Sequence, residues 1–315
     1  MTENTAQTIL PGTAEKIRYH RAGDFRILSE SLGELASRHP SLTLGCLGTS
    51  VLDRPLPIVT IGKNPQSRGI LFLGGIHPTD QITPAVLLRF LAEYAEALES
   101  GKRMYNMQMS YLFEHRTIHV VPMLNPDGYE LRRHGNPEEV VRSRLLKQNG
   151  GDNFHAWRAN ARGVDLWRNF TDGPDRVSDD EPVCPQGTAG LSPESEPETA
   201  AVCNYLRIMD EIGAVLSLHT LDGSIRAFSD DVYPPRSRTV LRLLSRMTGC
   251  TPAALPQPPD EIGGSLTDWF IRETGKPAFE CGCLTDENLR PDDPEAYRTV
   301  YAAFREALFS APLLI

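Results

Sequence analysis

The sequence lacks several features that would assign a protein to a class at once. No basic segment followed by an apolar run opens the chain, so no signal peptide is expected. No run of about 18 apolar residues predicts a membrane-spanning helix. The six cysteines are scattered, and the closest pair, Cys281 and Cys283, lacks the two-residue gap of zinc knuckles and thioredoxin-like motifs. A net charge of −9 argues against nucleic acids and anionic membranes as partners. These absences predict a cytoplasmic protein with reduced thiols.

What the sequence does contain is an alternation of apolar strands and amphipathic helices. Apolar runs predict strands over 68–76, 116–124, 214–220 and 277–282, and helical spacing predicts helices over 82–100, 195–213, 238–249, 264–275 and 294–309. Residues 125–128 predict a turn, and Ser195 with Glu198 has the spacing of a capping box. The alternation predicts an α/β fold with a mostly parallel sheet covered on both faces. We expect one domain over residues 1–315, with rim loops at about 132–163 and 171–194.

Polar side chains lie at the ends of several predicted strands, where parallel α/β sheets bind their ligands. His77 follows the strand 68–76, with Asp80 three residues on, and His219 ends the strand 214–220. Glu280 lies within the apolar strand 277–282, where an unpaired carboxylate is costly to bury. A catalytic zinc takes three protein ligands and keeps one position for water, and a separate carboxylate can act as general base. Each residue alone has a structural explanation, but their joint occurrence favours a metal site.

Several stretches, in order along the chain, resemble a known family. They are GGIHPTDQIT (74–83), LNPDGYELRRHG (124–135), WRANARGVDLWRNF (157–170), SEPET (195–199), SLHT (217–220), GGSLTDWF (263–270) and AFECG (278–282). Together they resemble the zinc metallocarboxypeptidases of the carboxypeptidase A type, above all the bacterial branch that acts on γ-D-glutamyl-diamino acid bonds of murein peptides. The resemblance runs from about residue 20 to the C-terminus and implies a mixed eight-stranded sheet sandwiched between helices.

The resemblance implies a role for each matching residue of the catalytic centre. His77 and His219 would be ligands of a single zinc ion, and Asp80 would occupy the third ligand position. Glu280 would be the general base, and Arg158 would stabilise the oxyanion.

The resemblance also implies a substrate-binding region. Arg168 would hold a substrate carboxylate, Trp167 and Asp268 would lie beside it, and Asp165 would orient His77 from behind. The departures from the family pattern include two residues of the predicted site. Asp80 stands where the family has the longer Glu, and Trp167 replaces an Asn that helps to bind the substrate carboxylate.

The sequence thus predicts a zinc-dependent metallopeptidase of the carboxypeptidase type that hydrolyses small peptides, with murein-derived peptides as candidate substrates. Two alternatives stay open. Asp80 and Trp167 are compatible with a pseudo-peptidase that keeps the fold and binds zinc weakly. An acyl-amino acid deacylase on the same scaffold is the other alternative. The sequence does not separate exo- from endopeptidase action and leaves the oligomeric state open.

Overall fold

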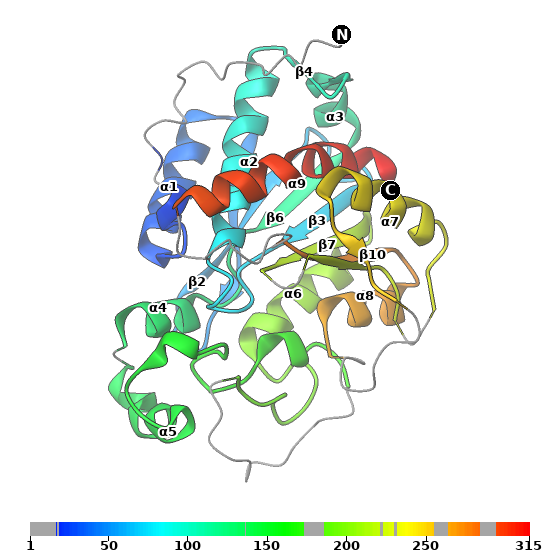
Figure 1. The fold of residues 1–315 in the computed structure, drawn as a ribbon. Coiled ribbons are helices and arrows are strands. Elements are labelled where there is room, and N and C mark those ends of the chain that lie inside the picture. The colour runs from blue at the N-terminus through cyan, green and yellow to red at the C-terminus, as the bar shows by residue number, and fades with distance from the viewer. Residues whose placement is uncertain are drawn as a thin grey trace.

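An eight-stranded mixed sheet forms the centre of the protein (Figure 1). A computed structural model describes residues 17, 19–135, 137–172, 186–220, 223–229, 232–254, 264–283 and 294–315. The strands are β1 (Leu42–Thr49), β2 (Pro55–Ile61), β3 (Gly69–Leu73), β6 (Thr117–Val121), β7 (Ile212–His219), β8 (Ser224–Arg226), β9 (Thr251–Pro252) and β10 (Ala278–Gly282). Their order is β1-β2-β6-β3-β7-β10-β8-β9. The four strands from β6 to β10 in this order run parallel, and the pairs β1–β2, β2–β6 and β10–β8 are antiparallel.

Helices cover both faces of the sheet (Figure 1). On one face lie α1 (Phe25–Arg38), α2 (Ile82–Glu99), α3 (Met109–His115), α7 (Ser237–Thr248) and α9 (Pro294–Leu314). On the other face lie α6 (Pro197–Ile208) and α8 (Leu266–Thr274). Successive side chains of the central strands pack against opposite helix layers. In β3, Ile70 and Phe72 face the layer that contains α2 and α9, and Leu71 and Leu73 face the layer that contains α6 and α8. This double burial explains why the central strands read as continuous apolar runs, and the prediction of a mixed, mostly parallel α/β sheet is confirmed.

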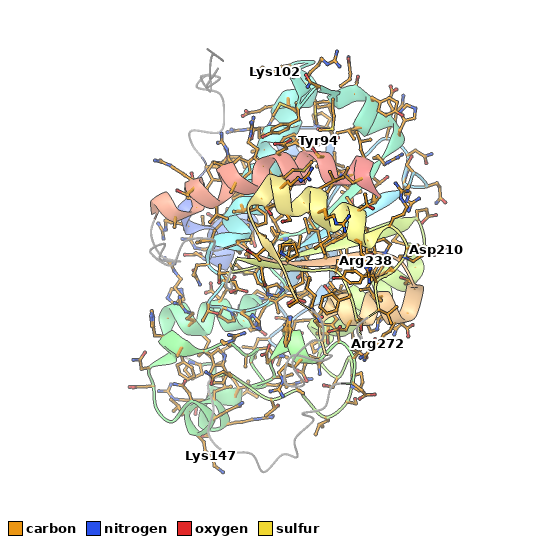
Figure 2. The ribbon with its side chains drawn as sticks, turned by 45° about the vertical axis from the view of Figure 1, so that its right-hand side comes forward. Tyr94, Lys102, Lys147, Asp210, Arg238 and Arg272 are labelled. Carbon is orange, nitrogen blue, oxygen red and sulfur yellow. The ribbon has the colours of Figure 1, made fainter. Side chains whose placement is uncertain are left out.

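A helical excursion leaves the sheet between β6 and α6. This excursion contains α4 (Pro126–His134), α5 (Glu139–Asn149), η3 (Phe154–Ala156) and η4 (Leu166–Arg168). Elsewhere, between α2 and α3, β4 (Arg103–Met104) and β5 (Met107–Gln108) form a separate hairpin. Lys147 on α5 and Lys102 lie at opposite ends of the molecule in Figure 2. The prediction of a rim loop over 132–163 was wrong here, because Leu131, Leu145 and Trp157 build a small apolar core of their own. Of the second predicted loop, residues 173–185 lie outside the described residues.

Two local predictions are corrected by helix starts. The predicted turn at 125–128 is the first turn of α4, where the Asn125 side chain accepts a hydrogen bond from the Gly128 amide and Pro126 occupies the first turn. The predicted capping box at Ser195 does not form, since α6 begins at Pro197 with Glu196 as its N-cap. Glu198 instead turns inward and is fully buried. No helix among the described residues is long and apolar enough to cross a bilayer.

Candidate metal centre and active site

Three predicted ligands converge at the carboxyl end of the central strands. His77 and Asp80 lie in the loop between β3 and α2, and His219 is the last residue of β7, which pairs with β3. All three are at most 2% exposed. Their donor atoms lie within 4.8 Å of one another, which among the described residues marks this set as able to hold a metal ion.

The distances from Asp80 to the two histidines fit a tetrahedral metal ion. Asp80 Oδ2 lies 3.4 Å from His77 Nδ1 and 3.5 Å from His219 Nδ1. A tetrahedron with bonds of about 2.1 Å has edges of about 3.4 Å. Asp80 Oδ2 and His219 Nδ1 are buried and have no hydrogen-bond partner. Two imidazoles and a carboxylate are the donors that zinc prefers in catalytic sites, so the residues present fit zinc even with the shorter Asp80.

Partners behind each ligand aim the donor atoms inward. His77 Nε2 lies 2.8 Å from Asp165 Oδ1, and His219 Nε2 lies 3.0 Å from Ser217 Oγ. Asp80 Oδ1 accepts hydrogen bonds from the amide and hydroxyl of Thr220. Such outer contacts fix ring orientation and tautomer, so the predicted role of Asp165 agrees with its position.

The ionisation of the ligands follows from this packing. Burial alone would lower the pKa of His77, but Asp165 and then Asp80 outweigh it and raise the pKa to about 9. Burial would likewise raise the pKa of Asp80, but the two histidines hold it well below its usual range. In the metal-free protein the His77 ring therefore holds a proton that a bound cation would displace.

Backbone contacts fix the loop that carries His77 and Asp80. Gly75 has φ +63°, and a Cβ there would lie 2.6 Å from the Cα of Met123, so only glycine fits without a shift. The Asn125 side chain donates to the carbonyls of Ile76 and Ala159, at 3.0 and 3.2 Å. Tyr129 donates its hydroxyl hydrogen to the Asp80 carbonyl at 2.8 Å. The excursion between β6 and α6 thus supports the ligand loop from one side.

Glu280 lies on β10, beside His219 and on the same side of the sheet as α8. Its Oε1 lies 3.8 Å from His219 Nε2, and its side chain is 11% exposed. Trp167 Nε1 donates to Oε1 at 2.7 Å, and Arg226 Nη2 donates to Oε2 at 2.7 Å. Burial would raise the pKa of this carboxyl, but the charges of Arg226 and then His219 hold it below its ordinary value. Glu280 is therefore an ionised carboxylate beside the metal cluster.

Arg226 is a residue of the site that the sequence interpretation missed. It lies opposite Glu280 in the pairing of β8 with β10, and its side chain is 9% exposed. It also donates to both carboxylate oxygens of Asp268, at 3.1 and 3.2 Å, and to Ser265 Oγ at 2.8 Å. The available signal was a charged residue in the apolar stretch SIRAF (224–228).

Asp268 does not lie where the sequence interpretation expected it. It is 0% exposed on the first turn of α8, and both of its oxygens accept hydrogen bonds from Arg226. A fully buried carboxylate with both oxygens engaged does not reach a substrate. Its predicted substrate contact is therefore revised in the proposal below.

Arg158 lies beside His77, the first of the predicted ligands. Its Nη2 is 3.2 Å from His77 Nε2 and 3.4 Å from Nδ1, while its buried Nε has no hydrogen-bond partner. A buried guanidinium donor without a partner, next to the metal cluster, is suited to a developing negative charge.

A short turn connects the metal cluster to Glu280. Asp165 is the N-cap of η4, and its Oδ1 also accepts from the Trp167 amide at 3.0 Å. Trp167 and Arg168 on this turn are half-buried. Gly264 packs onto it with φ +100°, and a Cβ there would lie 3.0 Å from the Arg168 Cα. The structure thus brings Asp165, Trp167 and Arg168 together on one turn beside the site.

Comparisons with known proteins agree on one family. Residues 28–257 match the zinc carboxypeptidase family. The chain is 30% identical over 260 residues to gamma-D-glutamyl-L-diamino acid endopeptidase 1 of Lysinibacillus sphaericus, covering 81% of this chain and 64% of that protein. It is 28% identical over 205 residues to mast cell carboxypeptidase A of Rattus norvegicus, covering 64% of this chain and 46% of that protein. The chain thus spans less than two thirds of the length of these two relatives.

Solved structures share the fold. The crystal structure of thrombin activatable fibrinolysis inhibitor matches with a TM-score of 0.75 at 20% identity, covering 95% of this chain and 75% of that chain. Carboxypeptidase A from Helicoverpa armigera matches with a TM-score of 0.69 at 16% identity, covering 96% of this chain and 77% of that chain. At these identities the likeness concerns the fold alone.

Proposed function

The chain belongs to the zinc carboxypeptidase family, a family of hydrolases, and from that premise we propose that it is a zinc-dependent peptidase that cleaves small peptides. One observation carries the proposal. Asp80 Oδ2 lies 3.4 and 3.5 Å from the Nδ1 atoms of His77 and His219, which is the edge length of a tetrahedral zinc site, and two of these three atoms are buried without a hydrogen-bond partner. The Glu280 carboxylate lies beside this cluster.

The chain's own residues divide the chemistry between them. Zinc held by His77, Asp80 and His219 would supply a Lewis acid that polarises water and the scissile carbonyl. Glu280 accepts a proton from the attacking water and later delivers it to the leaving amine. Arg158 stabilises the negative charge on the carbonyl oxygen through its free Nε donor.

The substrate is a small peptide with a carboxylate near the cleaved bond. Arg168 lies half-buried on the turn beside the site, and its planar guanidinium suits a carboxylate. The name of the Lysinibacillus sphaericus relative supports a γ-D-glutamyl-diamino acid bond as the first bond to test. Both oxygens of the buried Asp268 accept hydrogen bonds from Arg226. We therefore propose that Asp268 anchors Arg226 and does not contact the substrate.

Metal content and hydrolysis together test the proposal. Protein purified without added metal or chelator should contain close to one zinc per chain, and His77→Ala should lose it. His119→Ala is a matched control: His119 on β6 is equally buried, but its ring is hydrogen-bonded to Tyr205 of α6 and is not part of the cluster. Glu280→Gln should retain zinc and lose hydrolysis of a γ-D-glutamyl-diamino acid tripeptide.

Two results would replace the proposal by one of its alternatives. Failure of the protein to bind zinc, even when zinc is added back, would indicate a pseudo-peptidase. Hydrolysis of N-acyl amino acids in place of peptides would indicate a deacylase.

A further inference from the structure

We propose that Trp167 and Arg226 are positioning residues that hold Glu280 in place, one at each carboxylate oxygen. This inference rests on the proposed function, in which Glu280 is the general base. It assigns to Trp167 a role other than the substrate contact expected from the sequence, and it adds Arg226, to which the sequence assigned none.

The two donors approach different oxygens of the same carboxylate. The Trp167 indole N–H donates to Oε1 and the Arg226 guanidinium to Oε2, each at 2.7 Å. Because a carboxylate oxygen accepts about two hydrogen bonds, each oxygen keeps a free position for water or a leaving amine. A glutamate side chain has three rotatable bonds, and two donors on opposite oxygens restrict all of them. The carboxylate is held without being blocked.

Each donor is itself anchored. Arg226 donates to Asp268 and Ser265 at the first turn of α8, so the guanidinium is fixed from behind. Its backbone pairs directly with that of Glu280 across β8 and β10. Trp167 packs its ring against the core on the α8 side of the sheet. Neither donor can follow Glu280 if the carboxylate swings away, because both are tied to other elements.

The Trp167 contact also sets the base relative to the metal cluster. Asp165 Oδ1 is hydrogen-bonded to the His77 ring and accepts a hydrogen bond from the Trp167 amide. The Trp167 indole in turn donates to Glu280. One turn, η4, therefore spans from a metal ligand to the base. A displacement of about 1 Å in such an arrangement costs on the order of 100-fold in rate.

A matched pair of tryptophan substitutions tests the role of Trp167. Trp269 also donates its indole N–H to a carboxylate, Glu194 Oε1 at 3.0 Å, but outside the site. Trp167→Phe keeps an aromatic ring and removes the donor. It should lower kcat by roughly 10- to 100-fold with KM and zinc content unchanged, whereas Trp269→Phe should stay within about 2-fold of wild type in kcat.

Arg226 is tested by conservative rescue. Arg226→Met should lower kcat by at least as much as Trp167→Phe, and Arg226→Lys, which keeps a donor and the charge, should recover part of the loss. If Arg226→Met does not fold, the comparison of Arg226→Lys with wild type decides, because a single ammonium cannot reproduce the planar guanidinium that reaches Glu280, Asp268 and Ser265 together. A lower kcat with unchanged KM in Arg226→Lys supports the positioning role, and a wild-type kcat overturns it. In the Glu280→Gln background, Trp167→Phe should have no further effect on residual kcat, since the group it positions is gone.

The outcomes separate this inference from the function on which it rests. A wild-type protein that binds zinc but hydrolyses neither peptide nor N-acyl amino acid overturns the proposed function and this inference with it. A hydrolysing wild type in which Trp167→Phe and Trp269→Phe behave alike overturns this inference alone. The indole N–H resonance of Trp167 gives a readout independent of turnover: it should shift in Glu280→Gln, and the Trp269 resonance should not.

Discussion

Two of the polar clusters that the described residues bury differ in one respect. The metal cluster of His77, Asp80 and His219 leaves two donor atoms without a hydrogen-bond partner. The carboxylate cluster, defined here as Asp127, Glu196 and Glu198, is equally buried but leaves no oxygen unpartnered.

The carboxylate cluster is satisfied by the chain itself. Asp127 accepts from Ser50 Oγ, the Leu52 amide and Arg54. The Asn160 side chain donates to both glutamates, and the Val51 amide donates to Glu198. A saturated cluster stabilises the fold, whereas unpartnered atoms facing a common point indicate a ligand from outside. Burial and charge alone would not have distinguished the two clusters.

The largest effect that the comparison predicts is on metal binding. His219→Ala removes one of three protein ligands and should weaken zinc binding roughly 100- to 1,000-fold, since zinc sites gain about 10–16 kcal/mol from four ligands. Competition with a chelator of known zinc affinity measures this. The metal-free variant should still unfold cooperatively in urea, and retention of wild-type affinity would remove His219 from the ligand set.

The second prediction concerns the saturated cluster. Asp127→Ala leaves Arg54 and Ser50 without their buried acceptor and should lower the free energy of unfolding by about 3 kcal/mol. Urea denaturation measures the loss. Zinc affinity should stay within about 3-fold of wild type, and a loss comparable to that in His219→Ala would show that the two clusters do not act separately.

Glu198 gives the comparison a pH dependence. Burial raises the pKa of its carboxyl from 4.5 to about 7, and the hydrogen bond from the Val51 amide offsets only part of that rise. The folded state therefore holds the proton more tightly than the unfolded state. Below pH 4.5 the Glu198 carboxyl is protonated in both states and does not affect the free energy of unfolding. As the pH rises from 4.5 to 7, the free energy of unfolding falls, and above pH 7 it is lowered by the full amount.

Glu198→Gln should remove that penalty. We expect the variant to be about 2 kcal/mol more stable than wild type at pH 8 and equal to it at pH 4.5. Urea unfolding of both proteins at the two pH values measures the difference. An equal gain at both pH values would attribute the effect to packing and not to ionisation.

The smallest predicted effect concerns the outer partner of His77. Asp165→Asn weakens the contact that orients the ring and should reduce zinc affinity by about 10-fold. The same chelator competition measures it, with Ser217→Ala as the corresponding change behind His219. An effect as large as that of His219→Ala would mean that Asp165 does more than orient the ring.

Much of the fold was predictable from periodicity. The central strands, α2 and the end of α8 at Gly275 follow the predicted pattern, and the matches to known proteins confirm the family resemblance. No helix or strand is predicted over the first 67 residues, although α1 buries Ile27, Leu28, Leu32 and Leu35 at helical spacing. The stretch 132–163 is rich in Arg, Gly and Asn, a composition that predicts a loop. Since α5 buries only Leu145 along its length, this helix has no apolar stripe that the sequence would reveal.

The residues of the site that lie in sequence motifs were predictable, whereas the contacts that depend on strand pairing were not. His77, Asp80 and His219 lie in recognisable stretches, and the structure places them together. The contacts of Glu280 with Trp167 and Arg226 depend on how β8 pairs with β10 and on where η4 packs, which no local pattern specifies. The family motifs also supplied an expectation for Trp167 from the residue that it replaces, and its indole instead reaches the base. The prediction of one domain over 1–315 stays a prediction.

The parallel order of the central strands has a consequence for how the site is assembled in time. Contacts within the site join residues 88, 113 and 140 positions apart in the chain, in the pairs His77–Asp165, Trp167–Glu280 and Asp80–Thr220. Contacts of such sequence separation close large loops and form late in folding. A partly synthesised or misfolded chain therefore has no complete site, and the proposed zinc ligands come together only with the finished sheet.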